Sequence, residues 1–177
     1  MAIRNILTYP NPLLHRVSEP IQQFDIELAH LAQDMVETMK HANGIGLAAP
    51  QIGILKRLIV VQVPDEEGHL GPLYTVCNPV VTQTEGEAKI EEGCLSVPGL
   101  GVEVDRAFEI ILEGQNLDGS AFRMEADGLL SICFQHEIDH LDGKLLVNYV
   151  SSVKRELYRK EVIKKVQLEQ KDEKVQL

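Results

Sequence analysis

The sequence has no tryptophan, few aromatic residues (5%) and no long apolar run. A membrane-spanning helix needs about 18 or more predominantly apolar residues in a row, and no segment reaches that length. The start of the chain lacks the basic and then apolar pattern of a signal peptide. We therefore predict a cytoplasmic protein without a membrane span. The 177 residues, 44% of them hydrophobic and 25% charged, predict one globular domain over residues 1–177.

Cysteine is also scarce. Cys77, Cys94 and Cys133 are odd in number and widely spaced. This pattern argues against a disulfide framework and favours reduced thiols or a metal ligand.

Positive charge is scarce over most of the chain. The formal net charge is −10, which argues against binding of free nucleic acid. Residues 151–177 are the exception: they carry eight Lys or Arg and five acidic residues, a net +3, which leaves −13 for the remainder. A basic tail on an acidic body can contact an anionic partner, although a solvated helix face is the simpler interpretation.

The hydrophobic pattern predicts an α+β fold. Mostly antiparallel β-sheets should pack around a central buried helix, followed by an amphipathic C-terminal helix. We expect a helix over 25–43, strands over 58–63, 74–78, 80–84, 102–105, 108–113 and 121–125, and extended chain over 145–150. The final helix should span about 152–170, capped by Ser151 or Ser152. Its predicted apolar side consists of Val153, Leu157, Val162 and Val166.

The segment from Gly44 to Gln51 reads Gly-Ile-Gly-Leu-Ala-Ala-Pro-Gln. It is either a loop packed tightly under the core or a backbone that approaches a ligand closely, which small residues permit. It lacks the lysine and the spacing of a phosphate-binding loop, so we reject a nucleotide site.

The segment from Gln135 to His140 contains the pattern His-Glu-x-x-His. On a helix, His136 and His140 project from one face one turn apart, where both can bind one metal ion, with Glu137 beside it. The pattern also arises by chance. Here, however, the preceding helix is nearly all apolar, and buried polar groups need partners, which a metal ion supplies. Asp127 is the expected N-cap of this helix, and Gly143 should follow its end.

Two histidines leave a metal site incomplete, and two cysteines compete to be the third ligand. Cys94 follows a glycine and precedes a proline-marked turn, whereas Cys133 lies three residues before His136 on the same helix face. Spacing alone leaves this choice open.

Three segments together resemble the signature segments of the peptide deformylases, in the same order and spacing. They are Gly44–Gln51, Glu92–Gly99 and Gln135–Gly143, and the resemblance to bacterial-type members extends over nearly the whole chain. It implies a hydrolase that removes the formyl group from N-formylmethionine of new polypeptides and releases formate. It also implies that the C-terminal helix binds the ribosome.

The resemblance implies a role for each residue of the site. It assigns Cys94, His136 and His140 as metal ligands with water as the fourth, and Glu137 as the general acid and base. It places Gln51 and the Leu95 N–H at the formyl oxygen, and Gly46 and Gly99 along the peptide cleft. Helix spacing adds a slot for the methionine side chain beside the metal. This slot is formed by Leu129, Ile132 and Cys133 together with Ile45 and Ile90, although some of these residues are expected to be core packing only.

Two other functions fit the same pattern. A zinc peptidase also uses His-Glu-x-x-His, but no recognisable third-ligand motif follows downstream. A closed structural site would use Cys94, Cys133, His136 and His140. The ligand set itself accepts Fe²⁺, Zn²⁺, Ni²⁺ or Co²⁺. The resemblance favours Fe²⁺.

Overall fold

The computed structural model describes residues 2–65 and 67–175, with side chains up to residue 165. It contains three α-helices, α1 (Ile26–His41), α2 (Gly128–Leu141) and α3 (Ser152–Val175), and two antiparallel sheets. The predicted α+β class with antiparallel sheets is confirmed. None of the helices in these ranges combines the length and the apolar character that crossing a membrane requires.

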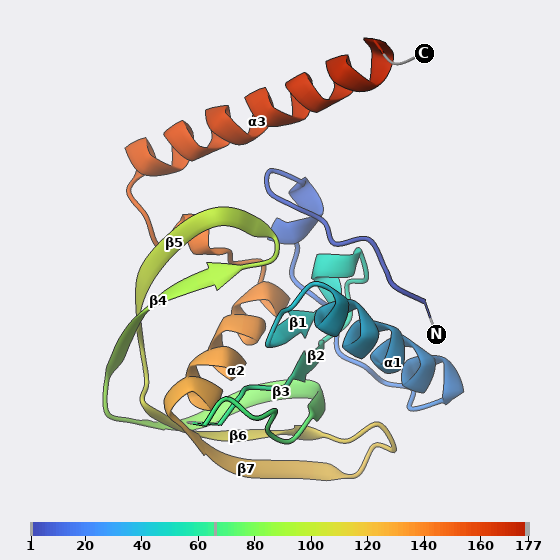
Figure 1. Cartoon of the computed structure of the whole chain (residues 1–177). Helices are drawn as coiled ribbons and strands as arrows, with labels where there is room; N and C mark the ends of the chain where they lie inside the picture. Colours follow the sequence, from blue (N-terminus) through green and yellow to red (C-terminus); the bar gives the residue numbers. More distant parts are fainter. Residues whose placement is uncertain (1, 66, 176–177) are drawn as a thin grey trace.

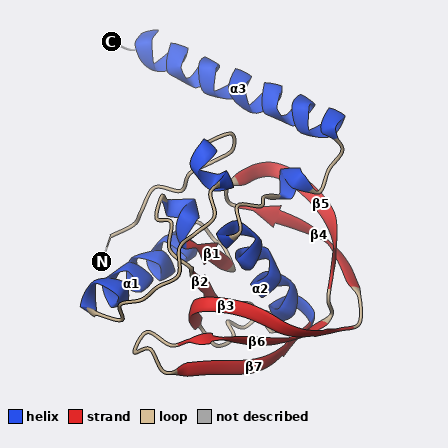
Figure 2. Ribbon diagram, turned by 180° about the vertical axis from the view of Figure 1, so that it is seen from behind, coloured by secondary structure: helices blue, strands red, loops and turns tan. Residues whose placement is uncertain are grey.

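The larger sheet has five strands in the order β1-β2-β3-β6-β7. The strands are β1 (Gly46–Ala48), β2 (Leu58–Val61), β3 (Tyr74–Glu85), β6 (Glu109–Gln115) and β7 (Ala121–Asp127). The smaller sheet is the hairpin of β4 (Ala88–Cys94) and β5 (Val97–Arg106). Helix α2 lies between the hairpin and the five-stranded sheet, and α1 lies beside β1 and β2 (Figure 1; Figure 2).

Helix α1 forms as the hydrophobic periodicity predicts. Asp25 caps it by accepting a hydrogen bond from the Leu28 N–H at 2.9 Å. Its apolar stripe is buried against β1 and β2, and consists of Leu28, Leu31, Met35 and Met39.

The 44–51 segment is more ordered than a loop. Gly46–Ala48 pairs with β2 as a short strand, and Ala49–Ile52 follows as a 3₁₀ helix. This pairing places the segment directly beside α2, which it contacts.

Several details differ from the predictions. Pro79 does not divide two strands, because β3 runs through it with a register shift between Cys77 and Val80. Asp127 is the last residue of β7, and its side chain makes no capping hydrogen bond to α2. The chain after α2 forms a 3₁₀ helix (Leu146–Asn148) instead of extended structure. The strand β4 was not expected, because its residues are mostly charged or small.

The C-terminal helix starts as predicted, and Ser151 accepts a hydrogen bond from the Lys154 N–H at 3.2 Å. Its predicted apolar face is wrong for Val153 and Leu157, which are 68% and 63% exposed. Val162 packs against the core as predicted, together with Tyr158, which was not predicted, while the Val166 side chain lies outside the described residues. The rest of α3 extends away from the body of the protein (Figure 1).

Candidate metal centre and active site

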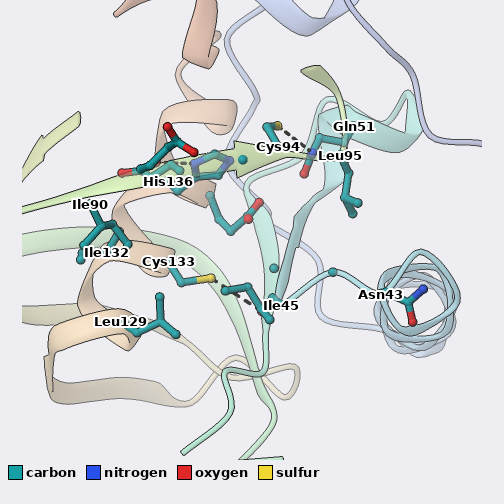
Figure 3. Close-up of a pocket in the computed structure, with 16 residues that line it drawn as sticks. Asn43, Ile45, Gln51, Ile90, Cys94, Leu95, Leu129, Ile132, Cys133 and His136 are labelled. Atoms are coloured by element: carbon teal, nitrogen blue, oxygen red, sulfur yellow. Dashed lines mark hydrogen bonds and ion pairs between the residues drawn. The ribbon is translucent and has the colours of Figure 1, made fainter. Parts of the chain in front are cut away.

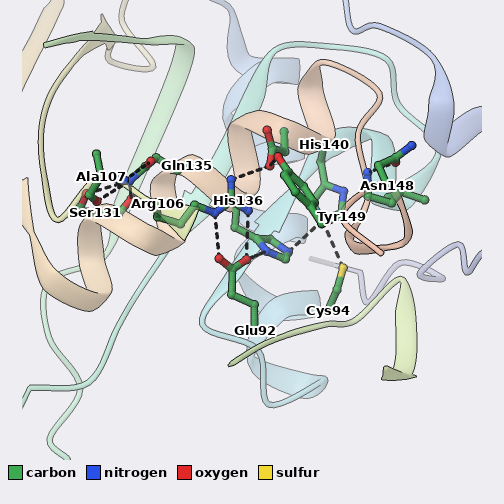
Figure 4. A network of polar contacts seen from close by, with 12 residues as sticks. Glu92, Cys94, Arg106, Ala107, Ser131, Gln135, His136, His140, Asn148 and Tyr149 are labelled. Atoms are coloured by element: carbon green, nitrogen blue, oxygen red, sulfur yellow. Dashed lines mark hydrogen bonds and ion pairs between the residues drawn. The ribbon is translucent and has the colours of Figure 1, made fainter. Parts of the chain in front are cut away.

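Three potential ligands converge between the hairpin and α2. Nε2 of His140 lies 3.2 Å from Sγ of Cys94 and 3.2 Å from Nε2 of His136 (Figure 4). All three ligand atoms lie within 4.8 Å of one another. Ligands of a tetrahedral metal ion, at about 2.0–2.3 Å from it, lie roughly 3.3–3.6 Å apart. The three groups therefore fit one divalent ion.

The competing thiol does not belong to this group. Cys133 is buried one turn before His136, and its Sγ lies 3.6 Å from the carbonyl oxygen of Ile45. Burial, followed by the charges of Glu137 and Glu92, raises the pKa of Cys133 well above its usual value. A protonated thiol is a poor metal ligand. Cys77 is completely buried as well, and burial raises its pKa to about 11.

A carboxylate behind the site orients His136. Nδ1 of His136 lies 2.7 Å from Oε2 of Glu92, and Arg106 donates two hydrogen bonds to the same carboxylate at 2.8 and 3.0 Å (Figure 4). Burial alone would raise the pKa of Glu92, but these hydrogen bonds outweigh it, and the net shift is downward. Because an ionised carboxylate only accepts, Nδ1 of His136 carries a proton, and in the neutral ring Nε2 is the nitrogen with a lone pair for a metal.

Arg106 also connects Glu92 to Asp139 on helix α2. It donates a 2.6 Å hydrogen bond to Asp139, which accepts another from the Tyr149 hydroxyl at 2.6 Å. The guanidinium carbon lies 5.3 Å from the centroid of the Tyr149 ring. The sequence analysis missed Glu92, Arg106 and Tyr149 because they are distant in sequence. The one available signal was that Asp139, on a buried helix, needed a cation.

Glu137 lies beside the ligands but outside this network. It is only 4% exposed, and its Oε2 has no hydrogen-bond partner within the described residues. Burial raises its pKa to about 7, against the lowering effect of His136. Gly46 leaves room for this carboxylate, because a Cβ there would lie only 2.9 Å from both Glu137 Cδ and Cys133 Sγ. A buried carboxyl group that titrates near neutrality can both accept and deliver a proton.

Two hydrogen-bond donors face the site from the other side. Oε1 of Gln51 accepts the Ala48 N–H at 2.7 Å, so its Nε2 points toward Ser96 Oγ at 3.1 Å and Cys94 Sγ at 3.8 Å. Leu95 lies in the turn between β4 and β5, and its N–H makes no hydrogen bond to the described part of the chain. Both donors are available to an oxygen atom held next to Cys94.

A cavity of about 430 Å³ opens beside these groups (Figure 3). Of the residues predicted for it, all line the cavity except Gly99 and the ligand His140. Gly99 lies exposed in β5, and a Cβ there would contact nothing within 4 Å. The apolar wall consists of Ile45, Ile90, Leu129, Ile132 and Cys133, and the polar end consists of Gln51, Cys94, His136 and Glu137. The sequence did not predict five further lining residues, Asn43, Gly44, Glu91, Glu92 and Gly93.

Comparisons with known proteins agree with this geometry. The model of the polypeptide deformylase family matches residues 3–156. The peptide deformylase of Alkalilimnicola ehrlichii is 46% identical over 166 residues, which cover 94% of this chain and 92% of the relative. That of Thermodesulfovibrio yellowstonii is 48% identical over 160 residues, which cover 90% and 96%.

Solved structures of peptide deformylases have the same fold. The crystal structure from Legionella pneumophila superposes with a TM-score of 0.85 at 41% identity, covering 95% of this chain and 98% of that one. The Ehrlichia chaffeensis enzyme, crystallised in complex with actinonin, has a TM-score of 0.88 at 38% identity, covering 93% and 98%. The chain belongs to the polypeptide deformylase family.

Proposed function

We propose that the chain is a metal-dependent amidohydrolase that removes the formyl group from N-formylmethionine at the start of new polypeptides. The observation that carries the proposal is the unpartnered carboxylate of Glu137, buried beside the Cys94, His136 and His140 cluster at the polar end of an apolar cavity. A zinc peptidase is not favoured, because the chain belongs to the deformylase family.

Cys94, His136 and His140 would hold the metal ion. Burial is the largest cause that lowers the pKa of His140 well below its usual value, which favours the neutral ring that a ligand requires. When bound, a divalent ion supplies a nucleophilic water at neutral pH and polarises the formyl carbonyl. We propose Fe²⁺ as the native ion, with Zn²⁺, Ni²⁺ and Co²⁺ as substitutes that the same ligands accept.

The protein groups carry out the proton transfers. Glu137 takes a proton from the attacking water as the oxygen bonds to the formyl carbon. It then delivers a proton to the methionine nitrogen as the carbon–nitrogen bond breaks, which yields formate and a free amine. The Gln51 amide and the Leu95 N–H donate to the formyl oxygen as it becomes negative. In other enzymes the loss of one such donor costs roughly 10²–10³-fold in rate.

The apolar wall of the cavity would hold the methionine side chain. Ile45, Ile90 and Leu129 are each 38–39% exposed, so they stand at the rim, where a side chain can enter. Such a pocket distinguishes one methylene by only about 1–3 kcal/mol. Neighbouring unbranched apolar side chains should therefore be accepted.

We also propose that residues 1–177 form one domain with α2 as its central helix, which the position of α2 between the hairpin and the five-stranded sheet supports. We further propose that α3 binds the ribosome, where the substrate emerges, and that the protein acts in the cytoplasm. Support comes from the net charge of +3 over residues 151–177 and from the exposed basic residues of α3, including Lys160 and Lys164.

A single assay tests the reaction. Metal-loaded protein is given a formyl-methionyl peptide, and both formate release and cleavage of internal peptide bonds are measured. We expect formate alone. Glu137→Gln should retain the metal but lose about 10²–10⁴-fold in kcat, because proton transfer is removed while the ligands stay. Internal cleavage, or a Glu137→Gln variant within about threefold of wild type, would contradict the proposal.

A further inference from the structure

The turn between β4 and β5 carries two groups of the site. Cys94 ends β4 and pairs with Val97 across the hairpin, so Leu95 and Ser96 form the turn itself. The position of this turn determines where the Cys94 thiol lies and in which direction the Leu95 N–H points. Ser96 also accepts the hydrogen bond from Gln51 at 3.1 Å. A shift of the turn would therefore displace both proposed donors to the formyl oxygen.

The turn is held by two tyrosines, Tyr9 and Tyr158, that do not line the cavity. The Tyr158 hydroxyl, on the second turn of α3, donates a 2.9 Å hydrogen bond to the carbonyl of Pro98. The Tyr9 N–H donates a 2.8 Å hydrogen bond to the carbonyl of Ser96. The two tyrosine rings stack, with centroids 5.9 Å apart and an angle of 28° between the planes. Two carbonyls at and just after the turn are thus fixed by two residues, through the backbone of Tyr9 and the hydroxyl of Tyr158, and the stacked rings hold these residues together.

This support is buried and close to the ligand. Tyr158 is only 8% exposed, and Cys94 packs against the same apolar cluster. Burial, with a smaller effect from Cys94, raises the pKa of Tyr158 to about 12. The hydroxyl therefore remains a donor at neutral pH. Tyr158 could not be singled out from the sequence, because the apolar side predicted for this helix consists of Val153, Leu157, Val162 and Val166.

We infer that Tyr158 is a positioning residue for the reaction. Its hydroxyl, acting through the Pro98 carbonyl, holds the turn in the place where the Leu95 N–H meets the formyl oxygen. This inference rests on the proposed deformylase activity. It also means that the first two turns of α3 stabilise the active-site turn, through the hydrogen bond from Tyr158 to Pro98.

Tyr158→Phe tests the inference, because it keeps the ring and its stacking and removes only the hydroxyl. Tyr74→Phe is the matched control. Like Tyr158, Tyr74 packs against another aromatic ring, in this case edge-on against Phe134, but its hydroxyl makes no hydrogen bond within the described residues. Both variants are loaded with the same metal as wild type. The measurements are kcat, KM, bound metal, thermal midpoint and amide hydrogen exchange at Val97, with Val60 in β2 as the internal reference.

We expect Tyr158→Phe to lower kcat per bound metal by roughly 2- to 10-fold, the effect of one lost hydrogen bond. KM should change little, because the cavity walls are untouched, and exchange should accelerate at Val97 but not at Val60. Tyr74→Phe should match wild type. An unchanged kcat per bound metal in Tyr158→Phe would overturn the inference, whatever the thermal midpoint does. Absence of formate release by wild type would instead refute the proposed function, and the exchange data would still report on the turn.

Discussion

Nδ1 of His136 lies 2.7 Å from a carboxylate oxygen of Glu92, while Nε2 of the same ring faces His140 at 3.2 Å. Nδ1 therefore acts as a hydrogen-bond donor to Glu92, and Nε2 is the nitrogen that faces the proposed metal position. Glu92 can hold this arrangement because Arg106 neutralises it inside the protein, with both side chains about 5–6% exposed. The hairpin therefore supplies both a ligand, Cys94, and the group that orients another ligand.

Glu92→Gln should weaken metal binding about 10- to 100-fold, the usual cost of losing the partner of a metal-bound histidine. The introduced amide can donate its NH₂ group to Nδ1 of His136, so the ring is no longer held in the tautomer that has its lone pair on Nε2. The substitution also removes the negative charge that compensates Arg106. The affinity is measured by competition with a chelator of known strength. Glu103→Gln is the control, an exposed carboxyl on β5 of the same hairpin. Equal affinity in the two variants would show that Glu92 does not orient His136.

The two cysteines of the site should behave differently when each is replaced by serine. Cys94→Ser removes the only thiol in the His136 and His140 cluster, so bound metal should fall well below one ion per chain. Cys133→Ser should keep nearly full occupancy, because that thiol contacts the Ile45 carbonyl instead. Metal content after dialysis, measured on folded protein, decides the matter. The reverse pattern would mean that the ligand is Cys133.

Elements with a strong local pattern could be predicted from the sequence, and elements that depend on distant partners could not. The periodicity of α1 and the apolar run of α2 identified both helices. The strand β4 was missed because its residues are mostly charged or small, and it becomes a strand by pairing with β5. The ion pair of Glu92 and Arg106 depends on the same pairing, which brings residues 14 positions apart into contact.

The C-terminal helix shows the same limit. Its basic charge and its start are local properties and were predicted correctly. Which side faces the core depends on the hairpin surface, with which Tyr158 makes a hydrogen bond and Val162 makes contact. Removing residues 151–177 would therefore damage the site as well as any ribosome contact, so point substitutions give a cleaner test.

Lys160→Gln combined with Lys164→Gln should weaken ribosome binding without affecting short-peptide activity, because both side chains are exposed and the ion pair of Lys160 with Glu156, at 3.9 Å, lies on the surface of α3. If each lysine contacts a phosphate, the slope of log affinity against log salt concentration should decrease by up to about 2. Lys40→Gln with Lys56→Gln, also exposed, is the control of equal charge. Co-sedimentation with ribosomes over a salt series gives the slope. Identical slopes for the two double variants would refute a ribosome contact through α3.

The bound metal should determine how quickly the protein loses activity in air. Cys94 must be a thiolate to bind a metal, and thiolates are the oxidisable form of cysteine. Fe²⁺ reacts with oxygen and would generate oxidants next to this sulfur, whereas Zn²⁺ has no redox chemistry. Ni²⁺ should protect the thiolate in the same way as Zn²⁺. Cys77 provides an internal control, because it is completely buried and its pKa is raised to about 11.

The test is to load metal-free protein with Fe²⁺, Ni²⁺ or Zn²⁺, expose each form to air, and follow activity and the mass of each cysteine-containing peptide. We expect the iron form to lose activity first, with oxygen added to Cys94 and none to Cys77. Restoring fresh Fe²⁺ should not recover the oxidised fraction, because a cysteine oxidised to sulfinic acid no longer supplies the thiolate ligand, and added metal does not reverse that oxidation. Full recovery with fresh iron would mean that the metal, and not the ligand, is the site of damage. Equal survival of the iron and nickel forms would show that oxygen sensitivity does not arise at this centre.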